Sequence, residues 1–136
     1  MTTTTSRTLT AIALMLATTI AGLIWRLAPL HLPFFFYKYG GSMLWAIAVY
    51  WLIAALLPRS TPPKLALLAA LAAAAVEFSR LIHTPAFDAF RETLAGKLLL
   101  GRYFSLKNIA AYWLAIALTA WLDSRILHPN RTHNTY

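Results

Sequence analysis

The chain has 136 residues, of which 60% are hydrophobic and only 12% are charged, whereas a soluble domain carries about 25% charged residues to cover its surface. A water-soluble fold of this length would therefore expose large apolar patches, so lipid is the better solvent for this composition. The net charge of +8 comes from basic residues spread singly or in pairs between apolar runs, which is typical of charges that flank membrane spans and disfavours nucleic-acid binding.

Four segments are long and apolar enough to cross a bilayer, which requires about 20 mostly apolar residues. In the first segment the apolar run continues to Trp25, past the core of about 7–15 residues of a signal peptide, so we expect a retained span. The third segment is free of charge only from Leu65 to Val76, and it reaches spanning length by including Glu77 and Arg80. The predicted spans are residues 9–27, 41–57, 65–82 and 108–127.

Prolines and aromatic residues mark the ends of these spans. Pro29 and Pro33 follow the first span, and further prolines make the link at 58–64 short and stiff. Aromatic side chains gathered at 34–39 are typical of the belt at a membrane interface. Because the 58–64 link is the tightest basic loop, we expect both termini to be cytoplasmic.

The connection at 83–107 is too long to lack structure of its own in a compact domain. Thr84 and Pro85 make a favourable helix start, and we expect a short amphipathic helix at about 85–100 on the membrane surface. Gly96 and Gly101 bracket a segment that either stays at this surface or re-enters the bilayer, where protein must cover its backbone. The apolar face of the expected helix is formed by Phe87, Phe90, Leu94 and Leu98.

These elements predict an all-α polytopic membrane protein with four transmembrane helices and a short interfacial or re-entrant helix between the third and the fourth. One domain covers residues 1–127, and a polar tail follows at 128–136. A transmembrane β-barrel would need alternating apolar and polar residues over segments of about ten residues, and the chain lacks that pattern.

Acidic residues are concentrated in one stretch, because Glu77, Asp88 and Glu92 are three of the four in the chain. Glu77 and Arg80 are three positions apart on the third span, so they share a helix face and we expect them to pair. Insertion of a charged side chain near the middle of the bilayer costs about 2.5–3.5 kcal/mol, and pairing with an opposite charge lowers this cost. If the helix at 85–100 folds back, Arg91 can reach Glu77, and Asp88 or Glu92 can reach Arg80. All five charges would then form one cluster at the membrane edge.

Two interpretations of this cluster stay open. In the first, the cluster is a polar site that contacts a ligand or an ion, which is the default hypothesis for ionisable residues inside a membrane. In the second, the charges are structural: Arg80 extends toward the headgroups with Glu77 as its partner. Asp88, Arg91 and Glu92 would then be the wet face of an interfacial helix.

Other candidates for chemistry are weaker. The four histidines share no metal-ligand spacing, and Ser42 and Ser79 lie in no nucleophile motif. The chain has no cysteine, which excludes disulfides and thiolate metal sites. We therefore expect no metal and no cofactor, and the sequence does not favour an enzyme.

Three stretches carry a resemblance to a known family. They are "YKYGGSMLWA" at 37–46, "VEFSRL" at 76–81 and "FRETLAGKLLLGRYFSLKNIAAY" at 90–112. Together they resemble DUF2809, a family of small bacterial membrane proteins without an established activity, which is itself similar to VanZ-like proteins. The resemblance implies a bacterial inner membrane location, and the link of VanZ-like proteins to glycopeptide resistance implies a lipid-like partner from the cell envelope.

The resemblance also ranks the candidate residues. Glu77, Arg91, Gly96 and Gly101 match positions of the family pattern. The pattern has Asp where this chain has Ser42, Gln where it has Arg80, and often Asp where it has Asn108. Glu77 and Arg91 are therefore the pair that the resemblance supports best.

Three functions are compatible with these observations. The first is binding of a lipid-like or amphiphilic molecule, or of a partner protein, in a charged pocket between the third span and residues 84–101. The second is a small transporter that acts as a homo-oligomer, with Glu77 as the coupling site. The third is a membrane enzyme that acts on a lipid headgroup. The candidate site residues are Glu77, Arg80, Asp88, Arg91, Glu92 and Asn108.

Overall fold

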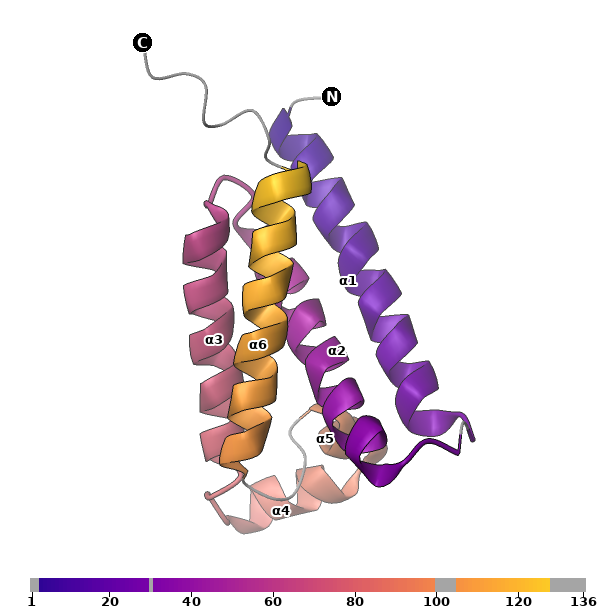
Figure 1. Ribbon diagram of the computed structural model, residues 1–136. Helices are drawn as coiled ribbons and strands as arrows, with labels where there is room; N and C mark the ends of the chain where they lie inside the picture. Colours follow the sequence, from indigo (N-terminus) through magenta and orange to yellow (C-terminus); the bar gives the residue numbers. More distant parts are fainter. Residues whose placement is uncertain (1–2, 30, 100–104, 128–136) are drawn as a thin grey trace.

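The computed structural model describes residues 3–29, 31–99 and 105–127, and its regular elements are all helical. The prediction of an all-α chain is therefore confirmed. Within this part of the chain, long helices run side by side, and short helices lie at one end of them (Figure 1). The elements are α1 (Thr3–Leu27), α2 (Phe34–Leu56), α3 (Pro62–Ser79), α4 (Pro85–Glu92), α5 (Leu94–Leu99), α6 (Leu106–Leu122) and the π-helical turn η1 (Asp123–Leu127).

Among the described residues, three helices are long and apolar enough to cross a membrane: α2, α3 and the part of α1 from Thr4 onward. They correspond to the first three predicted spans. The described part of α6 has 17 residues and continues directly into η1. Large apolar side chains such as Leu16, Leu71 and Leu118 are exposed on the outside of the bundle, as expected for helices that face acyl chains.

The observed helix starts differ from the predicted ones, because prolines fit the beginning of a helix. Helix α2 begins at Phe34 rather than at residue 41, directly after Pro33, and it includes the aromatic residues of the expected interface belt. Helix α3 begins at Pro62 rather than at residue 65, with Thr61 as its N-cap. A proline in the first turn loses no intrahelical hydrogen bond, since the first N–H groups of a helix have no partner there.

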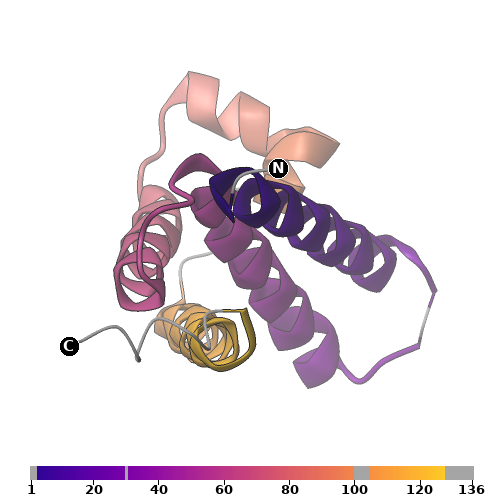
Figure 2. The same ribbon diagram turned by 90° about the horizontal axis from the view of Figure 1, so that it is seen from above.

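Helix α2 is the centre of the bundle, because it packs against α1, α3 and α6. Helix α3 also packs against α6, whereas α1 contacts the bundle mainly through α2; Figure 2 shows α1 to one side of the other long helices. The contacts use small side chains, which allow helix backbones to approach closely in membranes. The fully buried alanines are Ala11, Ala46, Ala54, Ala69 and Ala73.

The segment predicted as one interfacial helix at 85–100 is two helices, α4 and α5. Thr84 caps α4 by accepting a hydrogen bond from the N–H of Phe87 at 3.2 Å, as predicted. Thr93 then adopts an extended backbone and accepts a hydrogen bond from the N–H of Gly96 at 3.1 Å. Because the extended Thr93 ends α4 and α5 begins at Leu94, the single helix expected at 85–100 is not formed.

Helix α4 lies apart from the long helices of the bundle, and its predicted place at a membrane surface stays a prediction. Helix α4 runs across the end of the bundle, near the C-terminal end of α3 (Figure 1). Phe87 and Phe90 are partly exposed on it. The predicted choice between a surface and a re-entrant segment at 96–101 falls partly on residues 100–104, which lie outside the described residues, as does the tail at 128–136.

Candidate ligand-binding groove and buried polar layer

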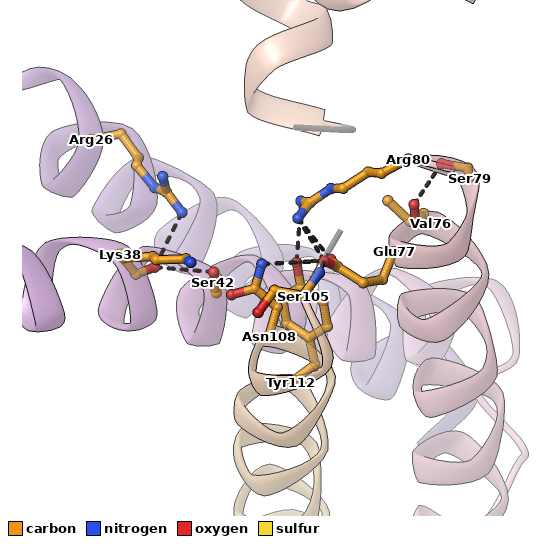
Figure 3. Close-up of polar contacts among 10 residues, drawn as sticks. All are labelled: Arg26, Lys38, Ser42, Val76, Glu77, Ser79, Arg80, Ser105, Asn108 and Tyr112. Atoms are coloured by element: carbon orange, nitrogen blue, oxygen red, sulfur yellow. Dashed lines mark hydrogen bonds and ion pairs between the residues drawn. The ribbon is translucent and has the colours of Figure 1, made fainter. Parts of the chain in front are cut away.

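A fully buried carboxylate connects the end of α3 with the start of α6. Glu77 has no exposed surface. Its Oε1 accepts hydrogen bonds from Arg80 Nη1 at 2.9 Å, from the backbone N–H of Ser105 at 2.7 Å and from Asn108 Nδ2 at 3.3 Å. Its Oε2 accepts a hydrogen bond from the Tyr112 hydroxyl at 3.0 Å and lies 2.8 Å from Arg80 Nη1. The pairing predicted for Glu77 and Arg80 is therefore present (Figure 3).

The surroundings of Glu77 explain why a carboxylate is stable here. Ser105 is the N-cap residue of α6, and its own side chain makes no capping hydrogen bond. The carboxylate of Glu77 therefore occupies the place where an anion is favoured by the free N–H groups and the dipole of a helix start. Arg80 neutralises it and also donates to the Tyr112 hydroxyl at 3.3 Å. Every oxygen of Glu77 thus has donors within the protein.

The polar side chains around Glu77 continue toward α2. Asn108 is buried, and its Oδ1 has no hydrogen-bond partner among the described residues. Ser42 is also buried and donates to the carbonyl of Lys38 at 3.0 Å. Figure 3 shows these side chains at one level of the bundle, with Arg26 on the far side. We call this set the polar layer; its members are Arg26, Lys38, Ser42, Glu77, Arg80, Asn108 and Tyr112.

The predicted contact between Arg91 and Glu77 is not formed. Arg91 is buried, and it donates to the carbonyl of Ile82 at 2.7 Å and to the carbonyl of Ser79. It also contacts Asp88 Oδ1 at 3.3 Å. The last carbonyls of a helix lack intrahelical partners and attract cations, so Arg91 binds the end of α3 instead of a carboxylate that is already satisfied.

The expected cluster of five charges is accordingly two separate groups. Glu77 and Arg80 form one group with Asn108. Asp88 and Arg91 form the other at the C-terminal end of α3, where the Asp88 side chain is 51% exposed. Glu92 is exposed on α4 and takes part in neither group.

A second buried ion pair, which the sequence did not reveal, lies at the opposite end of the bundle. Arg7 donates to both carboxylate oxygens of Asp123, at 2.8 Å and 2.6 Å. The Tyr50 hydroxyl donates to the same carboxylate at 2.6 Å, and the Arg7 guanidinium lies 5.4 Å from the centre of the Trp51 ring. The cluster joins α1, α2 and η1. Its sequence signal was that Asp123 is the single acidic residue outside the 77–92 stretch.

Arg26 differs from these arginines because it has no acidic partner within the described residues. Its Nη2 donates to the carbonyl of Lys38 at 3.3 Å, and its guanidinium lies 5.5 Å from the centre of the Tyr37 ring. The guanidinium also lies directly against Gly41, where an added Cβ would overlap with it. A glycine at this position of α2 therefore makes the room that Arg26 occupies.

A groove of about 410 Å³ runs between α1 and α2. Apolar side chains line most of it, with Gly22 and Ala48 among the small residues that leave it open. Arg26 and Gly41 line its end near the polar layer, and Ala95 of α5 also borders it. The pocket that the sequence predicts between the third span and residues 84–101 stays a prediction. This groove lies on the other side of α2, and among the described residues of that segment it borders Ala95.

In the described ranges 3–29, 31–99 and 105–127, no three histidine or acidic side chains gather in a way that suits a metal ion. Neither the curated proteins nor the solved structures include a match to the chain. The family described as "Protein of unknown function (DUF2809)" matches residues 31–116, which is more than half of the chain and includes α2, α3, α4 and most of α6. The chain therefore belongs to the DUF2809 family.

Proposed function

We propose that this protein is a four-span integral membrane protein that holds one amphiphilic molecule, with its tail in the groove between α1 and α2 and its polar end at the polar layer. The observation that carries the proposal is the shape and lining of the groove: it is apolar along its length and ends at the guanidinium of Arg26. An apolar groove with a polar group at one end matches an amphiphile, which has an apolar tail and a polar head.

The dimensions of the groove support this assignment. Its volume of about 410 Å³ falls in the range of about 300–1,000 Å³ that is usual for small-molecule sites. On α1 the lining extends from Met15 to Arg26, which is about 16 Å at 1.5 Å per residue. That length is close to one leaflet of a hydrocarbon core of about 30 Å.

In a four-span protein, α6 and η1 must together cross the membrane as the fourth span. The 17 residues of α6 cover about 25 Å, and η1 extends the segment further. Helix α6 packs against both α2 and α3 and runs beside them along the bundle (Figure 1). Because α2 and α3 are both long and apolar enough to cross a membrane, a helix that packs against both of them is expected to cross the same bilayer.

The polar layer favours binding over ion-coupled transport. A coupling site must exchange its proton or cation, whereas both oxygens of Glu77 already accept hydrogen bonds from Arg80, Tyr112 and other donors of the protein. Buried ion pairs of this kind hold elements together, because removal of one partner leaves an uncompensated charge. We therefore assign Glu77 a structural role in the bundle rather than a contact with the ligand.

Native mass spectrometry of the protein extracted with its membrane lipids tests the proposal. We expect one amphiphile per chain to remain bound. Ala48→Phe places an aromatic ring in the groove and should abolish this adduct. Ala117→Phe makes the same change on the exposed surface of α6 and should retain it. An adduct that survives in a folded Ala48→Phe variant at the wild-type level would refute the groove as the binding site.

A further inference from the structure

We infer that the molecule held in the groove is an anionic phospholipid, and that Arg26 binds its phosphate. This inference rests on the proposed function and adds the chemical class of the ligand. It follows from the distribution of charge among the described residues, which leaves the guanidinium of Arg26 without a carboxylate at the end of the apolar groove.

The acids of the chain are committed elsewhere. Asp123 pairs with Arg7, and Glu77 pairs with Arg80. Asp88 contacts Arg91 and His83, while Glu92 is exposed on α4. The sequence has only these four acidic residues. Arg26 and Lys38 therefore have no carboxylate within ion-pair distance in the described part of the chain.

Arg26 is also positioned to bind an anion. Three contacts fix its guanidinium at the end of the groove: the Lys38 carbonyl, the Tyr37 ring and the backbone of Gly41. The contact with Lys38 is a single bond of 3.3 Å, so most of the five N–H donors of a guanidinium are left for a ligand. Arginine presents these donors in a planar fork that matches the oxygens of a phosphate.

The same distribution disfavours a headgroup that carries an ammonium group. Such a group would need a carboxylate or other acceptors close to the phosphate. Glu77 is the acid of the polar layer, and both of its oxygens are engaged. Lys38 adds a second positive charge beside Arg26 and would repel an ammonium. A net-negative headgroup is therefore preferred over a zwitterionic one.

The experiment is competitive lipid binding to the full-length protein, measured by native mass spectrometry. Phosphatidylglycerol, phosphatidylcholine with the same acyl chains, and oleate are offered at equal concentrations. Both phospholipids offer a phosphate to Arg26, but the choline ammonium of phosphatidylcholine is repelled by the positive charges of Arg26 and Lys38. We therefore expect the wild-type protein to prefer phosphatidylglycerol over phosphatidylcholine by about tenfold. Arg26→Gln should bring that ratio close to one, and Arg26→Lys should retain part of it.

Arg59→Gln is the matched control, because Arg59 is exposed on the link between α2 and α3, at the opposite end of the bundle; it should keep the wild-type ratio. Binding of phosphatidylglycerol and phosphatidylcholine to equal extents would overturn this inference and leave the proposed function standing. Preferential binding of oleate would overturn the assignment to a phospholipid. Binding of none of the three would refute the proposed function itself. An unchanged preference in Arg26→Gln would show that Arg26 is not the phosphate-binding residue.

Discussion

Replacement of Glu77 by alanine is the most direct test of the role assigned to the polar layer. The change removes a fully buried carboxylate and leaves the Arg80 guanidinium buried beside an apolar side chain. Loss of one partner of a buried ion pair costs about 3–5 kcal/mol. The backbone N–H of Ser105 and the Asn108 amide also lose their acceptor, and each donor left without one costs about 1–3 kcal/mol.

These costs are not additive, because the four donors, from Arg80, Ser105, Asn108 and Tyr112, share one carboxylate and can relax together. We therefore expect a loss of at least about 3 kcal/mol, a large fraction of the 5–15 kcal/mol that stabilises a typical domain. The free energy of unfolding in mixed detergent micelles measures it. Glu92→Ala is the control: Glu92 is exposed, so its loss should change stability by less than about 0.5 kcal/mol. A Glu77→Ala protein that inserts normally and unfolds within about 1 kcal/mol of the wild type, the net contribution of a single hydrogen bond, would show that the ion pair does not hold α3 to α6.

The other predictions concern contacts between elements. Asp123→Ala should destabilise the protein by about 3–5 kcal/mol, and in a double-mutant cycle with Arg7→Ala the two effects should overlap rather than add; additive effects would contradict the ion pair at 2.6 Å. Arg91→Gln should increase hydrogen exchange at the C-terminal turn of α3 with little effect at η1, since Arg91 binds the carbonyls of that turn. Gly22→Cys with Leu44→Cys should form a disulfide under oxidising conditions, because a Cβ at Gly22 would lie 3.7 Å from that of Leu44 and disulfides need about 3.5–4.5 Å; a failure to cross-link would contradict the packing of α1 on α2.

The parts of the structure that the sequence predicted depend on short-range properties. A run of apolar residues is sufficient to predict a span, and the helices that suit a membrane follow the predicted ones. Glu77 and Arg80 were predicted to pair because they are three residues apart on one helix. The Thr84 cap was predicted from two adjacent residues in the same way.

The parts that the sequence did not predict depend on how distant elements meet. Arg7 and Asp123 are 116 positions apart, and nothing in either segment indicates the other. The sequence predicts that Arg91 can reach Glu77 because the two are oppositely charged, whereas in the structure Arg91 donates to the carbonyls of Ser79 and Ile82 at the end of α3. The groove depends on small residues of two helices facing each other, such as Gly22 and Ala48, and this register cannot be read from either helix alone.

Arg26 differs from the other interior arginines, and this difference bears on which residue indicates function. An ionisable residue inside a membrane is by default a functional candidate, and by that rule the sequence favours Glu77 as the site residue. Once the partners are known, Arg7, Arg80 and Arg91 each have a carboxylate oxygen within 3.3 Å, so their charges are balanced within the protein.

Arg26 is not balanced in this way, although it borders an apolar groove and its position depends on Gly41. A guanidinium that is left unpaired at the end of an apolar groove adds nothing to the stability of the fold. In the proposed function, a ligand that brings its own negative charge supplies the missing partner. Arg26 is therefore a better indicator of function in this protein than Glu77, the acid that is buried most deeply.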